Sequence, residues 1–415
     1  MFYRNITPKV IDALADTPVV LINGARQTGK STLVKKISSE IPAYRYLTLD
    51  DTGMLTAAKH DPAGFISGLE GNIIIDEVQR APELFVAIKA AVDRNRKPGR
   101  FLLTGSANVL LLPKLSESLA GRIEILTLWP LSQGEIEGVR ESFIDKVFGD
   151  KLPKLIKASD SKDQILKRMV LGGYPEVIGR TKADRRKAWF DAYLTTLMQR
   201  DIRDLANIEG LTILPRVLAL LAARASSLLN FSELSRSLGI PQTTLKRYLS
   251  LMETTFLLQP MQAWSGNLGK RLVKAPKVML NDTGLIANLA GLSDESKELY
   301  PGFIGSVFEN FVAMEFKKQI AWSKIQPKLF HFRTQAAQEV DIALEDSAGR
   351  IVGIETKLSN TVESRDFKGL AALNEAIGNR FHRGIVLYTG SEVIPFAKDM
   401  HAIPVNALWT MMSIA

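Results

Sequence analysis

Apolar runs of strand length alternate with helix-length segments over the first 130 residues. Runs that are apolar at nearly every position are typical of strands buried on both faces of a sheet. Buried strands separated by helical segments predict a parallel sheet covered by helices, so we expect an α/β fold for residues 1–130. The five runs are Val19–Asn23, Tyr46–Leu49, Ile73–Asp76, Phe101–Thr104 and Ile123–Leu128.

The rest of the chain divides into four further segments. Residues 131–210 are predicted to form a mostly helical connector, broken at Leu171-Gly-Gly-Tyr-Pro175, and residues 211–280 a helical module. Residues 281–302 are expected to be a linker, because Gly, Pro, Ser and Asp concentrate in 291–302. Residues 303–415 predict a second α/β domain, with a helix at Gly305–Gln319 and strands at Lys328–Arg333, Val340–Leu344, Ile351–Lys357 and Gly384–Tyr388.

A phosphate-binding sequence follows the first strand-like run at once. Residues 24–31 read GARQTGKS, which fits the GxxxxGK[ST] pattern between a strand and a helix. The glycines let backbone N–H groups approach phosphates, Lys30 reaches the β- and γ-phosphates, and the Ser31 hydroxyl ligates magnesium. We therefore expect ATP and Mg²⁺ to bind at Gly24, Ala25, Arg26, Gln27, Thr28, Gly29, Lys30, Ser31 and Thr32.

Two later strands end in residues that would complete this site. Asp76 ends an apolar run and is expected to hold magnesium together with Ser31, whereas Glu77 would polarise the attacking water. Thr104 or Ser106, after the next run, would sense the γ-phosphate, although capping of the following helix is an equally good interpretation. The sequence thus predicts an ATPase.

Arg122 lies just before the last apolar run of the first domain. One interpretation is an arginine finger that stabilises the transferring phosphoryl group of a neighbouring subunit. The other is a surface arginine in a salt bridge.

Residues 231–252 fit a helix, a glycine turn at Gly239 and a second amphipathic helix. The residues Phe256–Pro260 and Met261–Trp264 would then form the hairpin of a winged helix. In such a module the second helix enters the major groove of DNA, although winged helices also serve only as packing or protein-contact modules. The residues that would face DNA are Gln242, Thr243, Lys246 and Arg247.

The last domain contains a spaced set of charged residues. Glu355 and Lys357 lie two apart in one predicted strand and so share a face, and Asp341 lies in the preceding strand. Asp341 and Glu355 could hold a divalent metal ion, Lys357 could activate water, and Glu309 could complete the cluster for phosphodiester cleavage. An inactive ion-pair cluster, or a fold that binds nucleic acid without cutting it, are the alternatives.

Composition and charge narrow the possibilities. The 415 residues include no cysteine, which excludes disulfides and thiolate chemistry, and no signal-peptide or membrane-span pattern is visible, so we expect a cytoplasmic protein without a membrane partner. The surplus of residues 151–280 alone, with 22 Lys+Arg against 10 Asp+Glu, exceeds the chain's net charge of +9. A local surplus of this kind favours DNA as a partner over an ordinary solvated face.

Motifs along nearly the whole chain resemble those of bacterial and archaeal AAA-like P-loop ATPases that carry a C-terminal domain of unknown function. The resemblance implies an AAA-type ATPase core, a winged-helix element, a C-terminal fold similar to PD-(D/E)xK nucleases, and a homo-oligomeric ring such as a hexamer. The motifs are GARQTGKSTLV, IIIDEVQRAP, LLTGSANVLL, LAGRIEIL, LWPLSQGE, LGGYPEVI, RDIRDLANI, NDTGLIANL, GSVFENFVAMEF, EVDIAL and GIETKLS.

Two functions are compatible with these features. In the first, the ATPase acts on DNA, with junctions or ends as substrates and a metal-dependent nuclease-like domain. In the second, the P-loop domain is a nucleotide-dependent signalling switch, and the winged helix and the inactive C-terminal domain hold protein partners.

Overall fold

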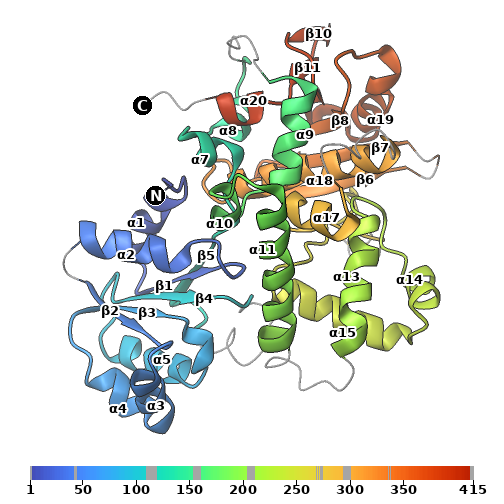
Figure 1. Ribbon diagram of the computed structural model, residues 1–415. Helices are drawn as coiled ribbons and strands as arrows, with labels where there is room; N and C mark the ends of the chain where they lie inside the picture. Colours follow the sequence, from blue (N-terminus) through green and yellow to red (C-terminus); the bar gives the residue numbers. More distant parts are fainter. Residues whose placement is uncertain are drawn as a thin grey trace. The chain divides into compact units, whose positions relative to one another are not determined.

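Contacts divide the chain into two compact units, coloured by sequence in Figure 1. The N-terminal unit comprises Arg4–Pro130 with Met252–Leu257, and the C-terminal unit comprises Met1–Tyr3, Leu131–Leu251 and Leu258–Ala415. No helix in the described part of the chain is long and apolar enough to cross a membrane. The computed structural model describes residues 2–41, 44–108, 119–152, 160–202, 211–267, 269, 271, 274–292, 301–334, 336 and 338–411.

The N-terminal unit is built on a five-stranded sheet in the order β2-β3-β4-β1-β5, in which all paired strands are parallel. The predicted parallel sheet is therefore confirmed. Because the carboxyl ends of parallel strands meet at one edge, the residues that follow β1, β3 and β4 come together there. The strands are β1 (Val19–Asn23), β2 (Tyr44–Thr48), β3 (Asn72–Asp76), β4 (Phe101–Gly105) and β5 (Ile123–Thr127).

Helices cover both faces of this sheet, with α1 and α2 on one face and α3, α4 and α5 on the other (Figure 1). Alternate strand residues such as Leu21 and Ile75 pack with Phe85 and Ile88 of α5 in one fully buried cluster. The sheet is thus held rigidly behind the loops that follow its strands. The helices are α1 (Thr7–Asp16), α2 (Lys30–Glu40), α3 (Thr52–His60), α4 (Pro62–Ser67), the 3-10 turn η1 (Val78–Arg80) and α5 (Leu84–Arg94).

The C-terminal unit contains a six-stranded mixed sheet in the order β10-β11-β9-β8-β7-β6. Strands β6, β7 and β8 are antiparallel neighbours, whereas β9 runs parallel to both β8 and β11. The second α/β sheet expected after residue 303 is therefore present. Its strands are β6 (Lys328–Arg333), β7 (Glu339–Glu345), β8 (Ile351–Lys357), β9 (Phe381–Tyr388), β10 (Ile394–Ala397) and β11 (Met400–Pro404).

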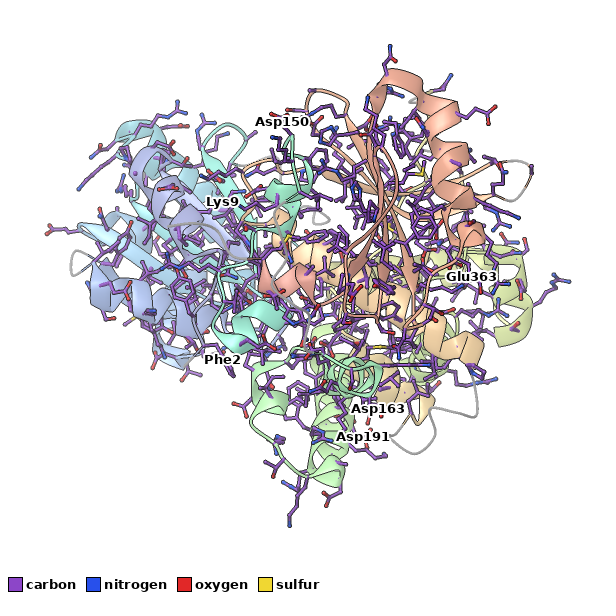
Figure 2. All side chains as sticks on the ribbon, turned by 90° about the horizontal axis from the view of Figure 1, so that it is seen from above. Phe2, Lys9, Asp150, Asp163, Asp191 and Glu363 are labelled. Atoms are coloured by element: carbon purple, nitrogen blue, oxygen red, sulfur yellow. The ribbon has the colours of Figure 1, made fainter. Side chains whose placement is uncertain are left out.

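Helices make up most of the remaining C-terminal unit, and charged side chains such as Asp191 and Glu363 are exposed on its outside (Figure 2). The described part of residues 131–202 is mostly helical, with a break between α9 and α10. The elements are α7 (Gln133–Glu137), α8 (Phe143–Val147), α9 (Lys162–Leu171), α10 (Pro175–Ile178), α11 (Ala183–Thr196), η3 (Leu197–Ile202), η4 (Leu211–Ile213), α13 (Leu214–Ala223), α14 (Phe231–Leu238), α15 (Gln242–Thr254), α17 (Thr283–Ala290), α18 (Pro301–Ile320), η6 (Ser364–Phe367), α19 (Lys368–Ile377), η7 (Gly378–Arg380) and α20 (Ala407–Thr410).

The predicted linker at 281–302 is wrong over its first ten residues. Asp282 caps α17 by accepting a bond from Leu285 N at 3.2 Å, and it also accepts one from Gly173 N at 2.7 Å. A Cβ on Gly172 would lie 2.2 Å from the Asp282 carboxylate, so the Gly-Gly pair lets the two segments approach. The predicted boundaries at 210, 280 and 302 therefore do not separate compact units. Residues 203–210 and 293–300 lie outside the described residues.

The predicted hairpin within residues 256–264 is also wrong. Leu258 and Met261 lie on one extended segment, and they form antiparallel bridges with Leu280 and Lys277, respectively. The partner is thus the segment 277–280 and not a neighbouring part of residues 256–264. The apolar pattern could not predict this, because it does not reveal which extended segments pair with each other. This pairing carries Lys277 toward the C-terminal sheet, as described below.

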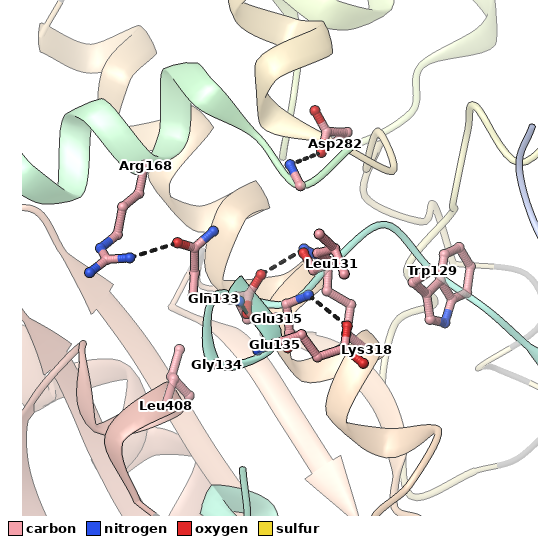
Figure 3. Close-up of polar contacts among 12 residues, drawn as sticks. Trp129, Leu131, Gln133, Gly134, Glu135, Arg168, Asp282, Glu315, Lys318 and Leu408 are labelled. Carbon is pink, nitrogen blue, oxygen red and sulfur yellow. Dashed lines mark hydrogen bonds and ion pairs between the residues drawn. The ribbon is translucent and has the colours of Figure 1, made fainter. Parts of the chain in front are cut away.

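The chain that follows Pro130 is fixed within the C-terminal unit by α18 (Figure 3). Lys318 donates to Leu131 O at 3.0 Å, and Glu315 accepts from Gln133 N at 2.9 Å. Ser132 and Glu135 form a capping box at the start of α7. The LSQGE sequence is therefore an anchored segment rather than a flexible connection.

Candidate functional site

The sequence GARQTGKS forms the loop between β1 and α2. Gly29 has φ 94° and directly precedes α2, and a Cβ on Gly24 would come within 2.2 Å of Leu128 O, so both positions require glycine. Lys30 is buried and donates to Gly24 O at 3.0 Å and to Ala25 O at 2.8 Å. These bonds fold the ammonium back over the loop in which phosphates would bind. The loop also contains Arg26 (partly exposed), Gln27 (φ 60°), Thr28 (buried) and, at the start of α2, Thr32 (exposed).

The end of β3 supplies a carboxylate beside this loop. Asp76 accepts hydrogen bonds from Ser31 Oγ at 3.1 Å, from Tyr46 Oη at 2.7 Å and from the Thr104 hydroxyl. Burial, followed by the bond to Asp76, raises the pKa of Tyr46. A hydroxyl and a carboxylate side by side are the oxygen donors that Mg²⁺ prefers, so the residues fit the metal that the sequence predicted.

Glu77, the predicted catalytic acid, begins beyond the end of β3 in a left-handed conformation with φ 61° and ψ 42°. A non-glycine residue in this region is strained, and such strain often occurs at functional sites. The Thr104 hydroxyl accepts from Glu77 N at 3.0 Å, and Ser106 Oγ donates to the Glu77 carboxylate at 3.2 Å. Gln79 donates to the same carboxylate and to Ser106 Oγ, the latter at 2.8 Å. Thr104 and Ser106 thus position the acidic pair, Asp76 and Glu77.

Arg122 lies at the opposite edge of the sheet. It immediately precedes β5, whose first residue Ile123 pairs in register with Val19 at the start of β1, whereas the phosphate loop follows the end of β1. Its guanidinium forms an ion pair with Asp93 and donates to Ala120 O at 2.9 Å. It lines a hollow of about 660 Å³ with Asp16 and Arg96, among others. Arg122 therefore cannot serve the phosphate loop of its own chain.

Helices α14 and α15 are joined through Gly239, which has φ 67°. Leu245 and Leu249 of α15 are buried, whereas Gln242, Thr243, Lys246 and Arg247 are exposed along one side of the helix. Internal contacts also occur on this face, since Gln242 donates to Ser232 Oγ at 3.1 Å, Lys246 lies over the Phe231 ring, and Arg247 is not without a partner.

A buried lysine occupies the predicted acidic cluster of the C-terminal unit. The side chain of Lys277 is 3% exposed, and its Nζ lies 2.6 Å from Glu309 Oε1, 3.5 Å from Asp341 Oδ1 and 3.7 Å from Glu339 Oε1. These carboxylates raise the pKa of Lys277 despite the opposing effect of burial. Burial, followed by the charge of Asp341, raises the pKa of Glu309 to about 8.

The remaining members of the cluster also have internal partners. Asp341 accepts from Thr356 N at 2.9 Å and from Thr356 Oγ1 at 2.7 Å, and Lys357 pairs with Asp366 at 2.8 Å. Burial, followed by the charge of Asp341, raises the pKa of Glu355 well above its usual value. Within the described ranges no group of three His, Asp or Glu side chains is arranged to hold a metal ion. As arranged, Asp341 and Glu355 therefore do not fit a divalent cation, because an ammonium already balances the cluster.

Sequence reasoning missed four residues that the structure places at these sites. Tyr46 and Gln79 contact the acidic pair of the phosphate site, Arg4 contacts the phosphate loop, and Lys277 enters the acidic cluster. Gln79 lies two residues after Glu77 and could have been considered from that spacing. The other three are distant in sequence from the residues they contact, and no local pattern indicates them.

Comparison with known proteins identifies related sequences and folds. Residues 16–137 match the AAA domain family, and residues 162–296 and 304–408 match the domains of unknown function DUF8612 and DUF4143. The uncharacterized proteins Rv2008c of Mycobacterium tuberculosis and Mb2031c of Mycobacterium bovis are each 31% identical over 413 residues, which cover 99% of this chain and 85% of theirs.

Solved structures that are similar to part of this chain include a Walker-type ATPase and a branch migration motor. The Walker-type ATPase Paby2304 of Pyrococcus abyssi has a TM-score of 0.44 and 15% identity, over 70% of this chain and 96% of that one. The Holliday junction branch migration motor RuvB of Thermotoga maritima has a TM-score of 0.31 and 22% identity, over 61% of this chain and 88% of that one.

Proposed function

The chain belongs to the family of AAA-domain proteins with a C-terminal DUF4143 domain, and from this premise we propose that it binds ATP with magnesium and hydrolyses it. The observation that carries the proposal is the cluster in which Ser31, Asp76, Thr104 and Glu77 meet at the carboxyl ends of adjacent strands beside a glycine loop. Each hydrogen bond in this cluster orients a group that phosphoryl transfer requires.

The roles follow from the contacts. The backbone N–H groups of the loop and the Lys30 ammonium would hold the phosphates, with phosphate oxygens replacing the carbonyls that Lys30 now contacts. Ser31 and Asp76 would hold Mg²⁺, which neutralises charge on the phosphates when bound. Glu77 would orient and deprotonate the attacking water once its carboxylate turns from Gln79 and Ser106.

The test combines nucleotide binding with steady-state hydrolysis. Lys30→Ala should abolish or greatly weaken ATP binding, and Glu77→Gln should retain binding while hydrolysis stalls. Lys36→Ala, on the same helix at a partly exposed position, is the control and should behave as wild type. Hydrolysis by Glu77→Gln at the wild-type rate would show that Glu77 is not the catalytic acid.

We further propose that the C-terminal unit contacts DNA through α15 and that the chain acts as a homo-oligomeric ring. Gln242, Thr243, Lys246 and Arg247 support DNA contact because they form an exposed polar and basic face over buried leucines. Assembly is what the family resemblance implies, and Arg122, which pairs with Asp93 at the far edge of its own sheet, could act only on another subunit. The alternative is the signalling switch, in which the same face of α15 holds a protein.

DNA contact and the signalling switch are distinguished by measuring binding to labelled duplex, single-stranded and branched DNA across a salt series. Lys246→Ala with Arg247→Ala should weaken binding and reduce its salt dependence, because two phosphate contacts are lost. The matched control is Lys182→Ala with Arg185→Ala, which removes the same charge from exposed positions near the start of α11. Absence of binding at low salt would support the switch.

Metal-dependent cleavage by Glu309, Asp341, Glu355 and Lys357 is a separate proposal. It requires Lys277 to leave the carboxylates, because its ammonium already contacts Glu309 and Asp341, two of the carboxylates with which a metal ion would have to interact. Wild type and Asp341→Ala would be incubated with junction, flap and duplex DNA, with magnesium or manganese and with or without ATP. If neither cuts any substrate, the inactive-domain interpretation holds.

A further inference from the structure

Arg4 contacts the phosphate loop from outside the motif. Its side chain is buried, and it donates from Nη1 to Thr28 O and from Nη2 to Trp129 O, each at 2.7 Å. The backbone of Arg4 is itself fixed at the start of α1, because Thr7 donates to Arg4 O from its N–H at 3.0 Å and from its hydroxyl at 2.7 Å. The backbone from which the guanidinium reaches the loop is therefore fixed.

The bond to Thr28 O determines where the next amide points. In a trans peptide the carbonyl and the following N–H point in opposite directions, and no cis peptide occurs in the described chain. With Thr28 O turned toward Arg4, the Gly29 N–H points away from the guanidinium. Gly29 precedes Lys30, and its N–H is one of the amides with which such a loop holds phosphate.

The second bond of Arg4 joins the loop to the segment that follows β5. Leu128 N donates to Asn23 O at 2.8 Å, and Leu128 O lies against Gly24 so closely that no Cβ fits. The same short segment thus supports the start of the loop through Leu128 and its end through Trp129 and Arg4. The guanidinium reaches the two carbonyls from separate nitrogens of its planar fork, Nη1 and Nη2, whereas a lysine would have to reach both from a single nitrogen, so a lysine would not reproduce this geometry.

We propose that Arg4 is a positioning residue of the ATP site, which holds the Thr28–Gly29 peptide so that the Gly29 N–H faces the phosphates. This inference rests on the proposed binding of ATP at residues 24–31. Arg4 touches no phosphate in this role and acts through the loop. Loss of its bonds leaves the peptide free to rotate, so part of the binding energy is then spent on ordering the loop.

The experiment measures the affinity of a fluorescent ATP analogue with magnesium for wild type, Arg4→Ala and Arg4→Lys. We expect Arg4→Ala to bind about tenfold more weakly, as for removal of charge-assisted hydrogen bonds. Arg4→Lys should also be weakened, because charge alone does not restore both bonds. Addition of ethylguanidinium should restore part of the affinity of Arg4→Ala and leave wild type unchanged.

The matched control is Arg100→Ala in the same unit. Arg100 Nη1 donates to Ala91 O at 2.7 Å near the end of α5, so its removal also deletes a guanidinium-to-carbonyl bond but not one to the loop. Wild-type affinity in Arg4→Ala, or an equal loss in Arg100→Ala, overturns the inference.

Hydrogen exchange without nucleotide separates this inference from the proposed function. Arg4→Ala should accelerate exchange in a peptide that covers residues 24–34, whereas Arg100→Ala should not. If wild type binds no ATP, the proposed function fails, and this exchange then decides the inference. Unchanged exchange in Arg4→Ala overturns it in either case.

Discussion

The position of Lys277 gives a stability prediction whose size can be worked from the structure. Lys277→Met keeps the length and apolar stem of the side chain but removes the ammonium that faces Glu309, Asp341 and Glu339. Breaking a buried ion pair by removing one partner typically costs 3–5 kcal/mol, because the remaining charge is left buried. Glu309, with its pKa raised to about 8, is largely protonated at pH 7 and does not present a full charge. The expected loss is therefore near the lower limit, about 3 kcal/mol.

The pH dependence of this loss has a definite sign. A carboxyl group whose pKa is raised on folding contributes stability that is present at low pH and lost as pH rises through its folded value. In wild type the loss of stability due to Glu309 ends near the folded pKa of this carboxyl group, about 8. Without Lys277 the pKa of Glu309 rises further, so the variant continues to lose stability above that pH. The difference between the two proteins should therefore be larger at pH 9 than at pH 7.

The assay is denaturant unfolding followed by tryptophan fluorescence at both pH values. Four of the five tryptophans, namely Trp189, Trp264, Trp322 and Trp409, lie in the C-terminal unit, so the signal reports mainly on that unit. Lys274→Met is the control, because Lys274 is an exposed lysine on the same segment. Equal denaturation midpoints for the two variants would refute the assignment of Lys277 as a buried counter-ion.

Three further predictions concern other charged groups. Mixing Arg122→Ala with Lys30→Ala subunits should restore part of the ATPase activity if Arg122 acts in trans, and no recovery in mixed assemblies would exclude that role. Burial, followed by the charge of Glu315, raises the pKa of Glu141, so its contribution to stability falls as pH rises. Glu141→Gln should therefore raise the melting temperature more at pH 9 than at pH 5. Burial lowers the pKa of His331 to about 4. The free energy of unfolding therefore falls as pH drops below 6.5, by about 2 kcal/mol at pH 5. The His331→Gln variant should lose less stability than wild type between pH 7 and pH 5.

The arrangement of the candidate phosphate site could be predicted from the sequence because its determinants are local. A glycine loop lies between a strand and a helix, and Asp76 and Glu77 directly follow another strand. Parallel pairing then brings the ends of these strands together without further information. The structure adds the partners of these residues, such as the bond from Tyr46 to Asp76, which depends on the alignment of β2 with β3.

The contacts of Lys277 and Arg4 could not be predicted, because they join residues that are far apart in the sequence. Lys277 reaches Asp341 only because residues 277–280 pair with 258–261, and apolar patterns do not reveal that pairing. Charge counts by segment do not reveal such pairings either. Arg271 forms two bonds with Glu345, of 2.6 Å and 2.9 Å, so it and Lys277 are paired with acids that lie beyond residue 280. The basic surplus of residues 151–280 is therefore smaller at the surface than in the sequence.

The two candidate sites differ in how much must change before chemistry can begin. At the phosphate loop, Lys30 donates to the Gly24 and Ala25 carbonyls, and these are contacts that phosphate oxygens can replace. At the acidic cluster, a metal ion would have to displace Lys277 from several carboxylates, and Lys357 would have to leave Asp366. The Lys277–Glu309 pair is buried, so breaking it costs several kcal/mol unless a ligand compensates, whereas the side chain of Lys357 is 40% exposed and costs less to release. The contacts thus favour the proposed nucleotide binding, whereas the proposed cleavage would require a rearrangement of the C-terminal unit that releases Lys277.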